Sequence, residues 1–244
     1  METKEWFEYW FNSPYYHILY KNRDDNEASG FLSNLIRLLR PEKNASFIDL
    51  ACGKGRHAIY LNKRGYKVTG LDISENSIKE AKKHENNTLK FRVHDMRNPY
   101  KAQAEYVLNL FTSFGYFNNK NEEKEAFKNM RQMLNKNGKV VVDYLNPNYV
   151  ANTMVSEEIK NVDGIEFHLS RKLKNDFIIK TIRFEHLNTQ HTFEERVRAI
   201  YAEEFEKLFL ATGFQIINTF GDYNLAPFSK TNSPRYIVYA KSDE

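Results

Sequence analysis

From residue 46 to residue 145 the sequence alternates short apolar runs with longer amphipathic segments, and this alternation constrains the fold more than any other feature. Apolar periodicity predicts strands over 46–50, 67–71, 89–94, 105–110 and 139–145, with helices over 55–64, 75–84 and 122–134 between them. Short apolar strands that are separated by helices form a parallel sheet covered on both faces. The pattern therefore predicts a doubly wound α/β fold.

The alternation stops after Pro147. Three strands in succession are predicted over 165–173, 177–186 and 192–199, with turns and no helix between them, which is typical of an antiparallel insert. A helix over 202–211 and strands over 214–220 and 236–240 then return to the main sheet and finish it with a hairpin. We expect a Rossmann-like, mostly parallel seven-stranded sheet with an antiparallel terminal strand and a small antiparallel β insert.

The N-terminal segment is dense in aromatic residues. Residues 4–20 are predicted to form short helical pieces interrupted at Ser13-Pro14, followed by a helix over 27–39 that ends before Pro41. The expected organisation is an N-terminal helical cap over 1–40, a Rossmann-like domain over 41–148 and 200–244, and an inserted antiparallel β lid over 149–199.

Composition narrows the cellular setting and the partners. Cys52 is the only cysteine, so no intrachain disulfide can form, and a reducing cytoplasm is the expected location. No run of eighteen apolar residues is present, so we expect no membrane span. The net charge of +4 is mild and its lysines and arginines are scattered, which disfavours nucleic acid as a partner. We expect a monomer or a homodimer.

Polar residues follow the predicted strands where a parallel sheet binds its ligands, beyond the carboxyl ends. The sequence places there Asp49 with the loop 51–55, then Asp72, Asp95-Met96, the stretch 110–115, and Asn146. Three successive strands each deliver a carboxylate to the same edge. An acid at that edge must be solvated, paired or bound to a ligand.

The glycine-rich loop is compatible with two classes of cofactor. Gly53, Gly55 and Ala58 satisfy the relaxed dinucleotide fingerprint, with Asp72 at the distance expected for a ribose contact. However, Asp49 at the mouth of the loop would repel a pyrophosphate. A phosphate-free ligand that carries an ammonium group would instead gain a partner from this carboxylate, and S-adenosylmethionine is such a ligand.

The segment Asp49-Leu-Ala-Cys-Gly-Lys-Gly-Arg-His resembles the first motif of class I S-adenosylmethionine-dependent methyltransferases, D/E-x-G-x-G-x-G, with Ala51 in place of the first glycine. The resemblance continues through Tyr66-Lys-Val-Thr-Gly-Leu-Asp72, through Phe91-Arg-Val-His-Asp95-Met96 and through the stretch 109–116, and it covers residues 46–146. Within this family, the sequence resembles the bacterial members that methylate small molecules.

The resemblance implies a role for each matched position. The methionine end of the cofactor would be held by Asp49 and by the backbone of Ala51 to Gly53, with Gly55 permitting a close helix approach. Asp72 would accept the ribose hydroxyls, Ile73 would pack on adenine, and Asp95 with the Met96 amide would read the adenine edge. Carbonyls near Leu110 and Phe111 would complete the ammonium site, and Arg56 would steer the carboxylate or lie on a helix surface. Outside the matched segment, we expect Tyr20 to close over the cofactor together with Tyr15 and Tyr16. A purely structural role remains open for each of these residues, as helix N-terminal acids or core side chains.

The expected reaction is an in-line displacement that transfers a methyl group to a nitrogen or oxygen atom of a small-molecule acceptor. It requires no metal, and the seven histidines show no metal-ligand spacing. On the acceptor side the candidates are Tyr116 and Asn146, the ring set Phe111, Phe114 and Phe117 for a dry pocket, and Arg183, Arg196 or Arg198 for an acidic group. Two alternatives stay open, an NAD-dependent oxidoreductase that uses the same loop and an RNA methyltransferase or RNA-binding module.

Overall fold

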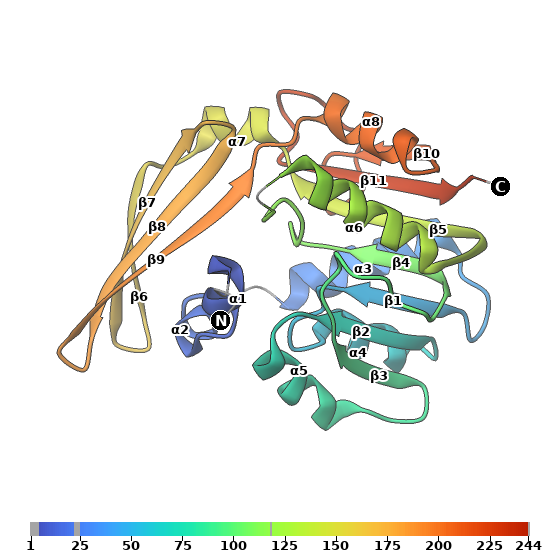
Figure 1. Ribbon diagram of the computed structural model, residues 1–244, viewed down its shortest axis with the longest axis horizontal. Helices are drawn as coiled ribbons and strands as arrows, with labels where there is room; N and C mark the ends of the chain where they lie inside the picture. Colours follow the sequence, from blue (N-terminus) through green and yellow to red (C-terminus); the bar gives the residue numbers. More distant parts are fainter. Residues whose placement is uncertain (1–4, 22–24, 118, 244) are drawn as a thin grey trace.

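A computed structural model describes residues 5–21, 25–117 and 119–243. Seven strands form the main sheet in the order β10-β11-β5-β4-β1-β2-β3 (Figure 1). Their bounds are β1 Ser46–Leu50, β2 Lys67–Asp72, β3 Leu89–Val93, β4 Ala104–Asn109, β5 Leu134–Leu145, β10 Phe214–Phe220 and β11 Arg235–Ser242. The neighbouring strands from β3 to β5 pair in parallel, whereas β11 runs antiparallel to both β5 and β10. The predicted fold class is confirmed.

Helices cover both faces of this sheet because each helix presents one apolar side to it. On one face lie α3 Asp25–Leu39, α4 Arg56–Lys63 and α5 Glu75–Ala81, the last continued by a 3-10 turn at Lys82–His84. On the other face lie α6 Lys120–Gln132 and α8 Ala202–Ala211. Phe47 of β1 and Phe91 of β3 are buried under the first group, and Phe127 of α6 and Phe209 of α8 are buried in the core on the other face. The two cores hold the strands rigidly, which fixes the positions of their carboxyl ends.

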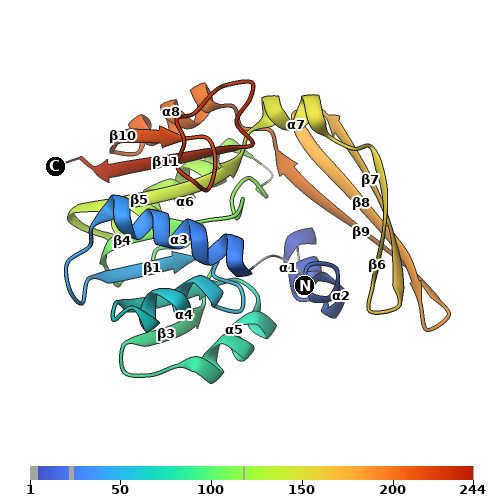
Figure 2. The same cartoon turned by 180° about the vertical axis from the view of Figure 1, so that it is seen from behind.

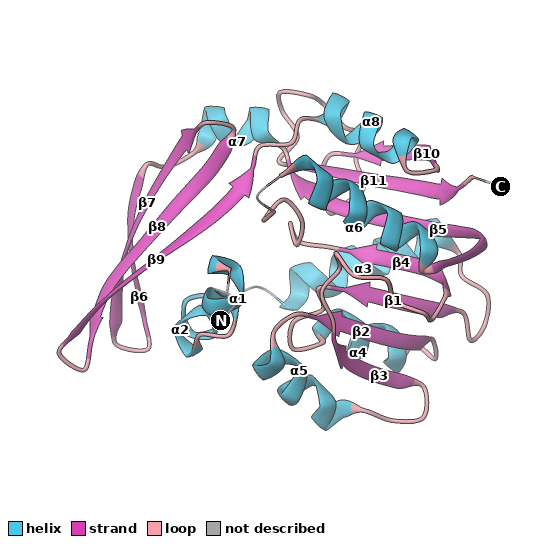
Figure 3. Cartoon of the chain, viewed as in Figure 1, coloured by secondary structure: helices cyan, strands magenta, loops and turns pink. Residues whose placement is uncertain are grey.

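The insert is a separate four-stranded antiparallel sheet in the order β6-β7-β8-β9 (Figure 3). Its strands are β6 Glu157–Val162, β7 Ile165–Lys174, β8 Phe177–His186 and β9 Thr189–Arg198, and the helix α7 Pro147–Thr153 leads into them. The sequence predicts the last three strands but neither β6 nor α7. Most residues of β6 are exposed, so this strand has no apolar alternation to reveal it.

Two short N-terminal helices, α1 Trp6–Phe11 and α2 Pro14–Leu19, lie between the carboxyl edge of the main sheet and the insert sheet (Figures 1 and 2). Trp10 and Leu19 pack with Phe167, Phe184 and Phe193 of the insert in one apolar cluster. In contrast, α3 packs on the main sheet through Phe31, Leu32 and Leu35. The expected division into cap, body and lid stays a prediction. None of the helices in the described ranges is long and apolar enough to span a membrane.

Candidate functional site

A pocket of about 480 Å³ opens at the carboxyl edge of the main sheet, below α1 and α2. Its volume lies in the range of small-molecule and cofactor sites, ~300–1,000 Å³. Its walls come from the loop after β1, the ends of β2, β3 and β4, and the two N-terminal helices. Ten of the twelve residues predicted to bind a cofactor line it, and the exceptions are Asp49 and Gly55. The ten are Ala51, Gly53, Arg56, Asp72, Ile73, Asp95, Met96, Leu110, Phe111 and Tyr20.

The loop after β1 turns sharply because several of its residues adopt left-handed backbone angles. Ala51 has a φ of 61°, Gly53 of 56° and Gly55 of 84°. A Cβ atom added at Gly55 would lie 2.5 Å from the ring of Phe91, so only glycine lets α4 begin this close to the sheet. Ala51, which replaces the first glycine of the resembled motif, keeps the left-handed geometry that such a turn requires.

Asp49 lies at the end of β1, one residue before the pocket wall, and its side chain is 1% exposed. Its Oδ1 is 3.9 Å from Nδ1 of His57, and its Oδ2 has no hydrogen-bond partner among the described residues. Burial, opposed by a hydrogen bond from the Ala58 amide, raises the pKa of Asp49 to about 7. A buried carboxylate with an unpartnered oxygen fits a site whose ligand brings a positive charge.

Asp72 at the end of β2 has a defined orientation. Its Oδ2 accepts the Gly53 amide at 2.7 Å and its Oδ1 accepts the Ser74 amide at 2.8 Å. Each oxygen of a carboxylate has a second lone pair, so both can still accept a ligand hydroxyl. Burial raises the pKa of Asp72, while the two amides oppose that shift. The geometry therefore fits a pair of ribose hydroxyls as donors.

The next wall carries Asp95 and Met96, which follow β3. The Asp95 carboxylate is held by Arg97, whose Nη2 lies 2.6 Å from Oδ2, and Arg97 also contacts Glu5 at 2.6 Å. Met96 is fixed from behind, because its carbonyl accepts the side-chain amide of Asn129 at 3.1 Å. This wall is therefore tied both to α6 and to the start of α1.

The wall after β4 is formed by Leu110 and Phe111. Phe111 has a φ of 59°, and its amide donates to Oδ2 of Asp143 at 2.7 Å. The guanidinium of Arg56 lies 4.6 Å from the centre of the Phe111 ring, and its Nε donates to His57. Arg56 thus lies in the pocket, which favours its predicted ligand role over a helix-surface position.

The N-terminal helices contribute wall residues that the motif analysis did not predict. Phe7 and Phe11, one helical turn apart, line the pocket together with His17. Burial, assisted by the charge of Lys54, lowers the pKa of His17 to about 4, and its Nε2 has no partner among the described residues. Only the aromatic density of residues 4–20 signalled these contacts. Tyr16 and Tyr20 line the pocket as expected, whereas the Tyr15 hydroxyl faces His186 of the insert at 3.0 Å.

The acceptor-side candidates separate into two groups. Tyr116 lines the pocket, and its hydroxyl donates to the Thr112 carbonyl at 2.6 Å. Asn146 is 2% exposed and does not line the pocket, because its side chain caps α7 and donates to the carbonyls of Lys230 and Ser233. Phe117 also lies on the pocket wall, whereas Phe114 is fully buried in the core.

The three candidate arginines of the insert lie away from the pocket. Arg183 is exposed on β8, and Arg196 lies 3.9 Å from Glu194. Arg198 is buried and forms ion pairs with Glu123 and Glu204, at 2.7 Å and 3.0 Å from Nη2. Its guanidinium therefore joins the insert to α6 and α8 rather than facing a ligand.

A second cavity of about 300 Å³ adjoins the first one. The two share Arg56, Phe111 and Tyr116 as lining residues. The far side of the second cavity is formed by Glu195 and Val197 of β9 and by Tyr223 of the loop before β11. A ligand in either cavity could therefore contact these three residues.

Comparison with known proteins places this site in a family. Residues 41–196 match the methyltransferase-domain family, and the chain belongs to it. The chain is 25% identical to YqeM of Bacillus subtilis over 201 residues, which cover 75% of this chain and 78% of YqeM. It is 29% identical to the dTDP-3-amino-3,4,6-trideoxy-alpha-D-glucopyranose N,N-dimethyltransferase of Streptomyces venezuelae, over 61% of this chain and 64% of that enzyme. A solved S-adenosylmethionine-dependent methyltransferase from Clostridium acetobutylicum superposes with a TM-score of 0.80 at 17% identity, covering 94% of this chain and 96% of that one.

The protein is thus an S-adenosylmethionine-dependent methyltransferase, with S-adenosylmethionine as its methyl donor. This decides between the two cofactor classes that the glycine-rich loop alone left open. The matched family and the relatives are methyltransferases, which disfavours the NAD-dependent oxidoreductase. A buried carboxylate such as Asp49, whose Oδ2 has no hydrogen-bond partner among the described residues, would also repel a pyrophosphate.

Proposed function

We propose that the protein methylates a nitrogen or oxygen atom of a small molecule that binds in the second cavity. The observation that carries this proposal is the wall common to the two cavities, formed by Arg56, Phe111 and Tyr116. A methyl donor in the first cavity and an acceptor in the second would meet there. Bringing two reactants together in a fixed orientation is the main contribution that a protein makes to such a displacement.

In the first cavity, the methionine end of the cofactor lies over the loop after β1. Asp49 and the backbone of Ala51 to Gly53 hold its ammonium and carboxylate groups, and the carbonyls near Leu110 and Phe111 complete the ammonium site. The Arg56 guanidinium lies beside the cofactor's carboxylate group. The unpartnered oxygen of Asp49 and its raised pKa support this role, because an ammonium neighbour would restore the ionised form.

The nucleoside end lies between β2, β3 and α2. Asp72 accepts the ribose hydroxyls, Ile73 packs on the adenine ring, and Asp95 with the Met96 amide reads its polar edge. The ring of Tyr20 closes this side. The arrangement is supported by the position of these residues on the pocket wall and by the two amide hydrogen bonds that orient Asp72.

The cofactor, when bound, supplies a methyl group on a positively charged sulfur. The chain's own residues then have to exclude water and align the acceptor. Phe7, Phe11, Phe111 and Phe117 give the first cavity part of its lining, and Phe111 lies at the shared wall, where its ring offers water no hydrogen bond. Displacement of ordered water by apolar groups also favours close approach of the two reactants.

Among the relatives, the Streptomyces venezuelae enzyme is named for methylating an amino sugar at nitrogen. That name supports a small molecule, and nitrogen in particular, as the acceptor class for this chain.

The test combines cofactor titration with a transfer screen. Calorimetric titration with S-adenosylmethionine, S-adenosylhomocysteine and NADH should give binding by the first two only. Transfer of labelled methyl from S-adenosylmethionine is then measured over sets of amines, sugars, carboxylic acids and RNA. Labelling of RNA, or of protein, without labelling of any small molecule would overturn the proposal.

A further inference from the structure

The second cavity holds four charged side chains, and the two cations among them already have other contacts. Nε of Arg235 donates to Oδ1 of the fully buried Asp143 at 2.8 Å, and its Nη2 donates to the Thr112 hydroxyl at 2.8 Å. Burial opposes the charged form of Arg235, but Asp143 outweighs that effect and raises its pKa. Arg56 lies on the wall shared with the first cavity, over Phe111. Both arginines are therefore engaged by other protein groups as well as lining the second cavity.

The two acids of the same cavity are Glu27 and Glu195. Glu27 is exposed at the start of α3, whereas the Glu195 side chain is 16% exposed on the inward face of β9. Because strand residues alternate in direction, Glu195 shares that inward face with Phe193 and Val197. A carboxylate so enclosed, at the wall of a cavity, is well placed to contact a ligand.

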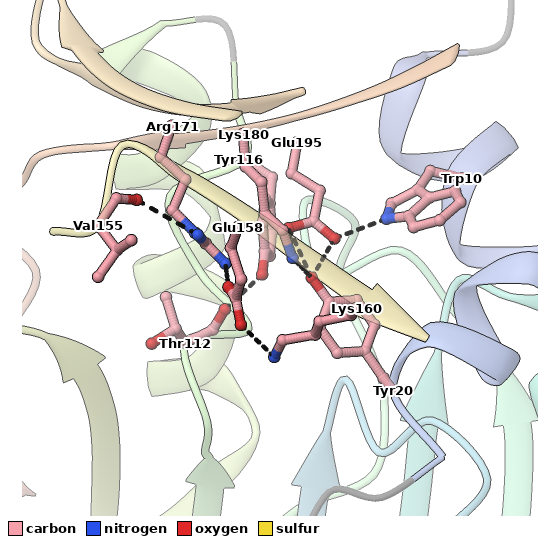
Figure 4. A network of polar contacts seen from close by, with 10 residues as sticks. All are labelled: Trp10, Tyr20, Thr112, Tyr116, Val155, Glu158, Lys160, Arg171, Lys180 and Glu195. Atoms are coloured by element: carbon pink, nitrogen blue, oxygen red, sulfur yellow. Dashed lines mark hydrogen bonds and ion pairs between the residues drawn. The ribbon is translucent and has the colours of Figure 1, made fainter. Parts of the chain in front are cut away.

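Three side chains position the Glu195 carboxylate (Figure 4). Nε1 of Trp10 donates to Oε1 at 2.7 Å, and the Tyr20 hydroxyl donates to Oε1 at 2.6 Å. Lys180, which is paired with Glu195 across β8 and β9, donates to the Tyr20 hydroxyl and lies 3.7 Å from Oε2. A carboxylate offers about four lone-pair sites, so the donors Trp10 and Tyr20 use only part of its capacity.

We propose that Glu195 binds the ammonium group of an amine acceptor and makes the enzyme selective for amines. This inference rests on the proposed function. A compact cation that donates two or three hydrogen bonds suits a fixed, partly buried carboxylate, whereas a carboxylate has no proton to donate to it and an alcohol would bring no charge. Tyr116, Tyr223 and Val197 surround the remainder of the cavity and suit an apolar or ring-shaped acceptor body.

The reaction balances without a further reactant. The protonated amine first releases one proton to solvent, and its lone pair then forms the new nitrogen–carbon bond. The carbon–sulfur bond breaks and leaves its electron pair on sulfur. The positive charge moves from sulfur to nitrogen, so Glu195 faces a cation when the ammonium binds and again after the transfer, with a neutral amine at the step between.

The test compares benzylamine, benzyl alcohol and benzoate, which share one ring and differ in charge. Each is titrated into the protein saturated with S-adenosylhomocysteine, and tryptophan fluorescence is followed, since Trp10 contacts Glu195 directly and the chain has only two tryptophans. Labelled methyl transfer to each compound is measured in parallel. We expect benzylamine to bind at least tenfold more tightly than the other two and to be the one methylated.

Glu195→Gln keeps the shape of the side chain and removes its charge, and we expect it to abolish the tenfold preference while cofactor affinity changes less than threefold. The matched control is Glu194→Gln, one residue away on the outward face and 47% exposed, which should keep the preference. Tyr20→Phe removes one donor to Glu195 and keeps the charge, so it should also retain the preference. If Glu195→Gln lost the preference only because the N-terminal helices loosened, Tyr20→Phe should lose it too. Retention of the preference in Tyr20→Phe would assign the effect to the charge of Glu195.

Three outcomes contradict the inference. A Glu195→Gln variant with an undiminished preference for benzylamine, or a wild-type protein that prefers benzoate or benzyl alcohol, would overturn the amine assignment and leave the methyltransferase function standing. Failure of the wild-type protein to bind S-adenosylmethionine would remove the proposed function and this inference with it.

Discussion

The two cavities meet at one wall but are built in different ways. The first is built around backbone turns at the ends of neighbouring strands, where Ala51, Gly53 and Phe111 take left-handed angles, and side chains of the N-terminal helices complete its lining. The second is formed by side chains from distant segments, such as Glu195 of the insert and Tyr223 near the C-terminus. One site depends on local geometry and the other on how the insert and the main sheet come together.

The difference bears on how each site tolerates change. The backbone turns of the first cavity cannot shift without disturbing the sheet, because Gly55 leaves no room for a Cβ atom beside Phe91 and Asp72 accepts the Gly53 amide. Side chains that line the second cavity can be exchanged with smaller consequences for the fold. We therefore expect substitutions in the first cavity to change the free energy of unfolding or the affinity for the cofactor. Substitutions in the second cavity should change the affinity for the acceptor alone.

The largest effect is expected from Asp49→Asn. The folded-state pKa of Asp49 is raised from 3.8 to about 7, so the wild-type cofactor-free protein loses stability as pH rises through this window. One pKa unit corresponds to 1.36 kcal/mol, so the neutral variant should be more stable by about 4 kcal/mol at pH 8 and by under about 2 kcal/mol at pH 5. Urea denaturation at both pH values measures this. A difference that does not depend on pH would contradict the raised pKa.

Asp49→Asn also tests whether Asp49 contacts the cofactor. If the ammonium of the cofactor pairs with Asp49, the more stable variant should bind S-adenosylhomocysteine more weakly than the wild type at pH 8. Calorimetric titration checks this. Unchanged affinity would show that Asp49 supports the loop and does not contact the ligand.

Asp72→Ala should weaken cofactor binding by about 100-fold. Two hydrogen bonds from hydroxyls to a carboxylate are lost, together worth about 3 kcal/mol. The fold should persist, although the amides of Gly53 and Ser74 lose their acceptor. Asp72→Asn retains an oxygen for one of them and should show a smaller loss. A folded alanine variant with wild-type affinity would remove Asp72 from the site.

Gly55→Ala tests the rigidity of the first cavity, with Gly65→Ala as its control. Both glycines have positive φ, of 84° and 91°, but only the Cβ at Gly55 would meet Phe91, whereas Gly65 faces open space. We expect Gly65→Ala to cost about 1 kcal/mol of unfolding free energy, from backbone strain, and Gly55→Ala about 3 kcal/mol, because overpacking adds to the strain. Equal costs in urea denaturation would show that the contact with Phe91 relaxes freely.

The first cavity was predictable from the sequence because its determinants are local. The strand and helix alternation located β1 and β2, and the rule that ligands bind beyond strand ends then selected Asp72, Asp95 and Leu110. Asp72 is the last residue of β2, Leu110 follows β4 directly and Asp95 lies two residues beyond β3, so an error of one or two residues in a boundary did not matter. The helix α8 and the strand β10 were also predicted with their observed bounds.

The second cavity was not predictable in the same way. The contact between Tyr20 and Glu195 joins residues 175 positions apart, and no local pattern encodes it. Asn146 illustrates the opposite case, since it follows β5 as expected, but Pro147 begins a helix there and the asparagine side chain caps it. Arg198 is likewise withdrawn from the insert surface by Glu123 of α6, a partner that strand alternation cannot reveal.

The smallest effect is expected from Tyr116→Phe, at the wall that both cavities share. Its hydroxyl donates to the Thr112 carbonyl, and loss of one neutral hydrogen bond near the acceptor costs about 1 kcal/mol, which corresponds to roughly fivefold in KM for benzylamine. Cofactor affinity should stay within about twofold, because the ring remains. The control is Tyr9→Phe, which removes a hydroxyl from a side chain that is 65% exposed and should leave both quantities unchanged. If Tyr116→Phe weakened cofactor binding and acceptor binding equally, the two cavities would have to be regarded as one site, and the contrast between backbone-built and side-chain-built walls would fail at the place where they join.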